Sequence, residues 1–176
     1  MADKIVFING IPALYEALSK AGREDEARKL IRDFLSQTFN SDLDAKVDRF
    51  RSLPTGIFDA SSPYFRIFWE FNQIYIAGLY YSTVVTSGIM CERVCLDILD
   101  KKKVKHKKRA CLGKLIQLIE KNKLAQVESI KEMKKIQKKR NEYVHPNMTA
   151  SNNQKDALEM VKSISTVLRN ECSATP

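Results

Sequence analysis

The sequence predicts an all-α protein. Apolar residues recur three or four positions apart nearly throughout its 176 residues, and no segment alternates convincingly in the way a half-buried strand does. The chain has only six glycines, five prolines and no low-complexity tract, so most of it should be ordered. Its length suits one domain of ordinary size. We expect a helical bundle over residues 61–176, preceded by an N-terminal helical extension over residues 1–60.

The N-terminal extension predicts three short helices. Pro12 and Gly22 bracket the first, because proline is tolerated in the first helical turn and glycine readily ends a helix. The second runs from about Glu24 to Phe39, and the third starts at Ser41, a residue suited to an N-cap. The apolar side chains expected to line the buried faces of the second and third helices are Ala27, Leu30, Ile31, Phe34, Leu35, Leu43, Val47 and Phe50.

The clearest break in the chain follows, from Pro54 to Pro63. Residues 63–99 then predict one long apolar helix, or two helices joined near Gly78 or Gly88, as the central element of a bundle. The core residues expected there are Phe65, Phe68, Trp69, Ile76, Leu79 and Tyr80.

Within this segment, residues 71–91 form a run of 21 uncharged residues, which is long enough to cross a bilayer. Asn72, Gln73, three tyrosines and several hydroxyl residues interrupt its apolar character. A buried central helix is therefore the better interpretation, and we expect no membrane association.

Three more helices are predicted after a basic connection at residues 101–109. They cover about Leu112–Lys121, Val127–Val144 and Gln154–Arg169. The last should present Leu158, Val161, Ile164 and Leu168 to the core.

The most informative feature is the sequence Arg-Asn-Glu-Tyr-Val-His at residues 140–145, where the second of these helices ends. Arginine can hold a phosphate through two parallel hydrogen bonds, and histidine exchanges a proton near neutral pH. Arg140 continues the packed face of its helix, so a carboxylate or a bound anion should compensate its charge. His145 precedes Pro146, where helical geometry is disfavoured, so its imidazole should lie at the helix end. The pair suits phosphodiester chemistry.

The interval of four residues between Arg140 and His145, with the polar Asn141 directly after the arginine, resembles the signature of the HEPN superfamily, the higher eukaryotes and prokaryotes nucleotide-binding domains. The surroundings also resemble a HEPN core, with residues 87–99 on one helix and residues 112–116 on the next. The resemblance implies a helical bundle with a long central helix hairpin.

The resemblance, which covers roughly residues 63–172, implies a metal-independent endoribonuclease of the toxin-antitoxin or antiviral defence kind. In that family two copies of the motif line one cleft of a homodimer, and the products are 2′,3′-cyclic phosphate and 5′-hydroxyl ends. Arg140 would stabilise charge on the reacting phosphate, His145 would transfer a proton, and Asn141 would orient either group. An antitoxin or a nucleotidyltransferase is a conceivable further partner.

Two further residues are candidates for supporting the site. In the family a polar residue on the preceding long helix often does so, and Glu92 fits that role best, with Arg93 second. Tyr143 can stack on a base or donate a hydrogen bond.

Each of these residues also has a structural interpretation. Arg140 can be the salt-bridge partner of Glu92 or Asp97. His145 can simply cap the helix C-terminus, and Tyr143 can belong to the core or an interface.

The net charge of +9 is concentrated ahead of the motif, because residues 101–140 carry 16 basic and 3 acidic side chains. Such a patch attracts a polyanion by releasing its counterions, although lysines also simply solvate exposed helix faces. Its proximity to the motif favours RNA. His106, in the same patch, is expected to be solvated or to contact a phosphate. The side chains expected to bind RNA are Lys135, Lys138, Lys139, Lys107, Lys108 and Arg109.

The four cysteines show no disulfide framework, and the N-terminus lacks a signal-peptide pattern, so we expect a cytoplasmic protein. Cys91 and Cys95, taken with His106 and Cys111, fit no common zinc motif and are better interpreted as small buried hydrophobes. No nucleotide-binding glycine loop or metal-ligand cluster is visible, so no metal or cofactor is expected.

The alternative to an endoribonuclease is a catalytically silent HEPN module that binds RNA, a nucleotide or a partner protein. The presence of Arg140, Asn141 and His145 together favours the enzyme, because a binding module has no obvious need for a proton-transfer residue beside its arginine. A membrane-associated helical regulator built around residues 71–91 is a third function class.

Overall fold

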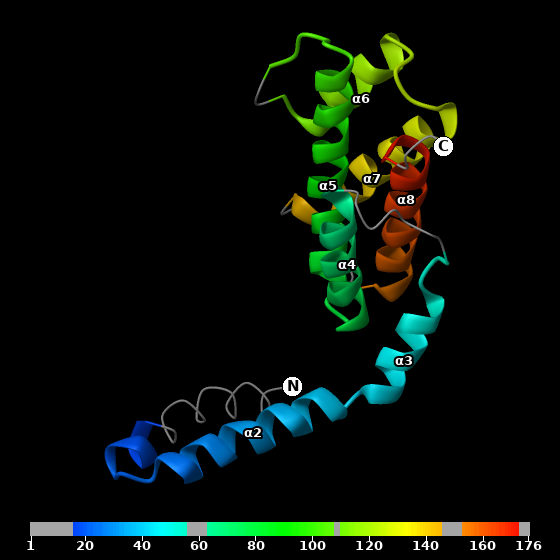
Figure 1. The fold of residues 1–176 in the computed structure, drawn as a ribbon. Coiled ribbons are helices and arrows are strands. Elements are labelled where there is room, and N and C mark those ends of the chain that lie inside the picture. Colours follow the sequence, from blue (N-terminus) through cyan, green and yellow to red (C-terminus); the bar gives the residue numbers. More distant parts are fainter. Residues whose placement is uncertain (1–15, 56–62, 108–109, 146–152, 173–176) are drawn as a thin grey trace. The chain divides into compact units, whose positions relative to one another are not determined.

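All regular secondary structure described by the structure, a computed structural model, is helical (Figure 1), which confirms the all-α prediction. The chain divides into two compact units, residues 1–45 and 46–176. The division therefore comes earlier than the boundary expected at residue 60. The structure describes residues 16–55, 63–107, 110–145 and 153–172.

In the first unit, residues 16–20 are helical, and the remainder of the first predicted helix lies outside the described residues. Gly22 follows with φ of +74°, a conformation that suits a residue without a Cβ. The helix α2, Glu24–Asn40, matches the second predicted helix. Its expected apolar face is buried only in part: Ala27 is buried, Leu30, Ile31 and Phe34 are half-buried, and Leu35 is exposed.

The third predicted helix is α3, Leu43–Ser52. Ser41 is the C-cap of α2 instead of the expected N-cap of α3, since its backbone N–H donates to Gln37 O. The side chains of Leu43, Val47 and Phe50, expected in the core, are exposed.

The buried side chain of α3 is Arg49. Its Nε donates to the Ile76 carbonyl oxygen at 2.7 Å, and its Nη1 donates to Tyr80 Oη at 3.3 Å. These two acceptors offset the cost of burying the guanidinium. Arg49 is therefore buried on α3, whereas its apolar neighbours, which were expected in the core, are exposed.

The long apolar segment forms two helices, α4, Pro63–Ile76, and α5, Tyr80–Lys101. The break falls at Gly78, whose φ is +78°, whereas Gly88 lies inside α5. This turn divides the uncharged run 71–91, and no helix in the described part of the chain is long and apolar enough to cross a membrane.

The helices α4 and α5 form the expected hairpin. Tyr64, at the start of α4, donates a hydrogen bond to Asp97, near the end of α5, so the two helices run antiparallel. The core prediction for this segment was correct in part: Phe68 is buried and Ile76 and Tyr80 are half-buried, whereas Phe65, Trp69 and Leu79 are exposed. The buried side chains follow a different face at intervals of four, three and four: Tyr64, Phe68, Phe71 and Tyr75.

The C-terminal helices have nearly the predicted bounds: α6 is Leu112–Lys121, α7 is Val127–Val144 and α8 is Gln154–Cys172. α5 packs on α6, α7 and α8, and α7 also packs on α6 and α8. Figure 1 shows α5 and α8 side by side, with α7 crossing at an angle. Fully buried side chains of this bundle include Leu99, Leu115, Met133, Ile136, Met160, Ile164 and Leu168.

Candidate functional site

The candidate site lies at the C-terminal end of α7, where the predicted motif ends the helix. His145 has φ of −84° and ψ of 129°, the extended geometry expected before Pro146. Its backbone N–H still donates to the Asn141 carbonyl oxygen at 3.2 Å. Its side chain is exposed and makes no hydrogen bond or ion pair in the part of the chain that the structure describes. The imidazole is therefore accessible for proton transfer.

Arg140 is half-buried where α7 crosses α5. A Cβ placed on Gly88 would come within 2.7 Å of Arg140 Cγ, so the stem of the arginine lies directly on the α5 backbone. Its Nη1 donates to Asn141 Oδ1 at 3.3 Å. Within the described ranges Arg140 forms no ion pair. Its guanidinium charge is thus left for a ligand, a partner copy or solvent.

If Arg140 had a purely structural role, Glu92 or Asp97 was expected to be its salt-bridge partner. Asp97 instead accepts a hydrogen bond from Tyr64 and lies 3.9 Å from Arg93 Nε. Glu92 is half-buried one turn after Gly88, and among the described residues it makes no hydrogen bond or ion pair with the motif. The supporting roles expected of Glu92 and Arg93 therefore have no contact behind them in a single copy.

Tyr143 is the buried residue of the motif. Its side chain is buried, its ring packs against Tyr81 with centroids 6.0 Å apart, and its Oη donates to Asp156 Oδ2 at 3.0 Å. Burial, together with this carboxylate, raises the pKa of Tyr143 to about 12. The phenol therefore stays protonated near neutral pH and joins α7 to α8, which agrees with the core interpretation.

The lysines expected to bind RNA differ in whether an acidic side chain lies within ion-pair distance. Lys135 lies 2.9 Å from Glu132, and Lys139 lies 3.1 Å from Glu142 and 3.3 Å from Asp156. Lys138 and Lys107 are exposed and form no ion pair in the described ranges. Lys108 and Arg109 lie outside the described residues. The available positive charge is therefore smaller on α7 than the residue count suggests.

The cysteines do not form a metal site with His106 in the described structure. Cys91 and Cys95 are buried in α5, and Cys95 Sγ lies 3.8 Å from Met133 Sδ. Cys111 is exposed and is the N-cap residue of α6. Within the described ranges no group of three or more His, Cys, Asp or Glu side chains could hold a metal ion.

Gly88 is a residue of the candidate site to which the sequence analysis assigned no role there, since it was named only within the helix 87–99 and as a possible helix break. Its signal was a residue without a side chain inside an otherwise bulky helix, which often marks close approach of another element. Only the three-dimensional structure shows that Arg140 is the residue that approaches.

No family model, curated protein or solved structure matches this chain.

Proposed function

We propose that this protein is a metal-independent endoribonuclease, as its resemblance to HEPN toxin and defence nucleases implies. The observation that carries the proposal is the state of Arg140. This half-buried arginine has no carboxylate partner in the described ranges, is held by Asn141 and lies one turn before the exposed His145. An uncompensated, partly desolvated guanidinium is suited to receive a phosphate.

The residues support a transesterification. Neutral His145 would take the proton of a ribose 2′-hydroxyl, whose oxygen forms a bond to the adjacent phosphorus as the bond from phosphorus to the 5′-oxygen breaks. A protonated second histidine would give its proton to the departing 5′-oxygen. Arg140 would stabilise the extra negative charge on the non-bridging oxygens. The products are a 2′,3′-cyclic phosphate and a 5′-hydroxyl, and no metal takes part.

The second histidine would come from a second copy of the chain. Large apolar side chains that are next in sequence to Gly88 and His145 are exposed: Ile89 is 62 % exposed and Val144 is 39 % exposed. Tyr81, which packs on Tyr143, is 50 % exposed. A two-fold contact through these side chains would cover them and bring two motifs to one cleft.

Such an enzyme would act on RNA in the cytoplasm. The exposed Lys138, on the last turns of α7, would contribute to attracting the RNA backbone. An antitoxin or nucleotidyltransferase partner would restrain the activity.

The test is cleavage of RNA by the purified chain in EDTA, with analysis of the new ends. The intact chain should give cyclic-phosphate ends, and Arg140→Ala and His145→Ala should each lower the rate by roughly 100-fold or more. Arg169→Ala removes an arginine from an exposed position on α8 and should leave the rate unchanged. Cleavage that persists in both motif variants would overturn the proposal.

The alternative function is an RNA-binding module without catalysis. It would be supported if neither the intact chain nor His145→Ala cuts RNA, while both bind RNA with the same strong dependence on salt.

A further inference from the structure

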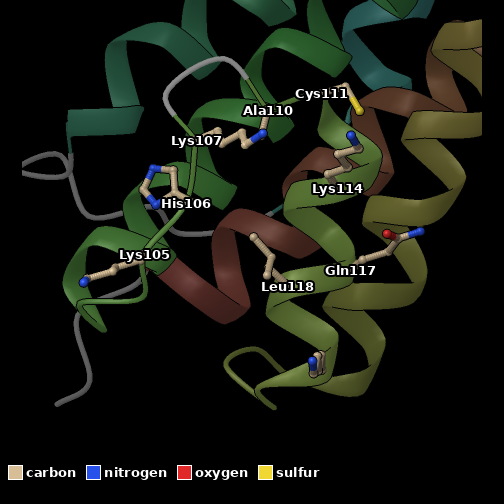
Figure 2. A pocket seen from close by; sticks show the side chains of 9 residues that line it. Lys105, His106, Lys107, Ala110, Cys111, Lys114, Gln117 and Leu118 are labelled. Carbon is tan, nitrogen blue, oxygen red and sulfur yellow. The ribbon is translucent and has the colours of Figure 1, made fainter.

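A pocket of about 840 Å³ lies between the connection that follows α5 and the exposed side of α6 (Figure 2). Four lysines line it: Lys105 and Lys107 on the connection, and Lys114 and Lys121 on α6. Ala110 and Leu118 supply apolar surface. The volume falls in the range of pockets that hold small organic ligands.

The described lining of the pocket has an excess of positive charge, because it contains four lysines and no acidic side chain. The four lysines are exposed and form no ion pair in the described ranges. Two acids close in sequence to the lining residues have other contacts: Glu120 Oε1 lies 2.6 Å from Lys134 Nζ, and the exposed Asp100 carboxylate lies 3.7 Å from His106 Nε2. These lysine charges therefore lack a compensating partner within the chain.

His106 lines the pocket, and its burial corrects one of the two expectations for it, that the side chain is solvated. Its side chain is only 11 % exposed, and its Nδ1 lies 3.1 Å from the Val104 carbonyl oxygen. This local contact fixes the imidazole beside Lys105 and Lys107.

The arrangement of the lysines suits an extended anion. Lys114 and Lys121 are two helical turns apart on one face of α6, roughly 10 Å along the axis. Figure 2 shows Lys105 and Lys114 toward opposite ends of the pocket, on its two walls. Charges spread in this way fit several phosphates of one strand better than a single small anion, which would need the lysines to converge on one point.

The pocket is connected to the motif helix α7 through α6. A Cβ on Gly113, at the start of α6, would collide with the side-chain amide of Gln137. Gln137 precedes Arg140 by one turn on α7, and Gln117, one turn beyond Gly113, lines the pocket. The start of α6 thus joins the basic pocket to the helix face that carries Arg140.

We propose that this pocket holds nucleotide units of a single-stranded RNA that flank the phosphate bound at Arg140. The lysines would contact successive phosphates, and a base or ribose would lie on Leu118. The assignment rests on the proposed function, and it specifies the substrate: a single strand long enough to reach from the motif into the pocket.

Binding of a labelled single-stranded RNA of about 10 nucleotides tests the proposal, with His145→Ala present in every chain so that the RNA stays intact. The double variant Lys114→Glu/Lys121→Glu should weaken binding at least about tenfold and lower the salt slope by about 1.4, for two lost phosphate contacts. The control Lys155→Glu/Lys162→Glu makes the same charge change on the exposed side of α8. Its effect should stay within about twofold.

Two outcomes overturn the proposal. Equal loss in the pocket and control variants would show a general effect of net charge. Loss of ATP binding in the pocket variant, with RNA binding unchanged, would identify a free nucleotide as the occupant.

Cleavage kinetics separate this proposal from the proposed function. In the chain with His145 intact, Lys114→Glu/Lys121→Glu should raise KM for the RNA of about 10 nucleotides and leave kcat unchanged. If the chain never cuts RNA, and the pocket variant alone loses RNA binding, the proposed nuclease function is refuted and the assignment of the pocket to RNA stands.

Discussion

The stem of Arg140 lies directly against the backbone of Gly88, where a Cβ would come within 2.7 Å of Arg140 Cγ, 3.2 Å of Cδ and 3.3 Å of Cβ. These atoms belong to the near end of the side chain, which cannot move without a new rotamer or a shift of α7 against α5. The position of the guanidinium therefore depends on the absence of a side chain at residue 88.

Gly88→Ala tests this dependence. The added methyl should displace Arg140 and lower cleavage by roughly 100-fold, because small misplacements of a catalytic group are that costly. Overpacking of about 1 to 3 kcal/mol should be partly offset by better helix propensity, so the chain should still fold. Cleavage rates with circular dichroism and urea unfolding measure both effects.

Gly113→Ala is the matched control, since its Cβ would meet only the amide tip of Gln137, the far end of a flexible side chain. It should fold and cleave like the intact chain. Equal activity of Gly88→Ala and the intact chain would show that the position of Arg140 does not depend on the missing side chain at residue 88.

Second, Ile89→Glu tests the dimer expected around the motif. A charge at this 62 % exposed position should weaken self-association, so cleavage should fall most at low protein concentration and recover as concentration rises. Ile67→Glu is the control, because Ile67 is 43 % exposed on α4 near the Tyr64 to Asp97 end of the hairpin. Light scattering across a dilution series measures the mass. An unchanged mass for Ile89→Glu would place any dimer contact elsewhere.

The bounds of α6 and α7 could be predicted from sequence because the signals are local. Apolar spacing of three and four residues defined each helix, and a histidine before proline ended α7. The break between α4 and α5 was narrowed to Gly78 or Gly88, and only the backbone decides between them. Gly78 adopts a positive φ, whereas Gly88 is helical and makes room for a neighbouring element.

Features that depend on packing between distant segments were not predictable in this way. The aromatic residues of α4 offered more than one apolar face, and the neighbouring helices selected the one containing Phe68 and Phe71. Burial of Arg49 was not expected, because its partners Ile76 and Tyr80 lie 27 and 31 residues away in the sequence. The basic pocket likewise depends on tertiary structure: Lys105 and Lys121 both line it, although no local sequence pattern predicts that they lie on one pocket.

Third, Tyr143→Phe separates a packing role from a catalytic one. Loss of the hydrogen bond to Asp156 should destabilise the chain by about 1 to 2 kcal/mol, because the phenol is buried and its acceptor is charged. Cleavage should remain within about twofold of the intact chain, since the hydroxyl faces α8. Urea unfolding and initial rates give the two numbers. A large loss of kcat with unchanged stability would instead assign the hydroxyl to the reaction.

Fourth, the buried carboxylate of Glu132 predicts how stability varies with pH. Burial tends to raise its pKa, but hydrogen bonds from Ser163 and Lys135 outweigh this and hold the pKa below its ordinary value of 4.5. The unfolded chain therefore binds this proton more readily than the folded one. The stabilisation is fully present above pH 4.5 and is lost as the pH falls through the lower folded-state pKa.

Glu132→Gln should accordingly cost about 1 to 2 kcal/mol of unfolding free energy at about pH 7, and the difference should shrink at about pH 3. Glu128→Gln is the control: its exposed carboxylate lies 3.8 Å from Lys131, and its loss should cost less than about 0.5 kcal/mol at either pH. Urea unfolding of the three chains at both pH values gives the comparison. A difference for Glu132→Gln that is the same at both values would mean that the side chain acts through its shape and not through its charge.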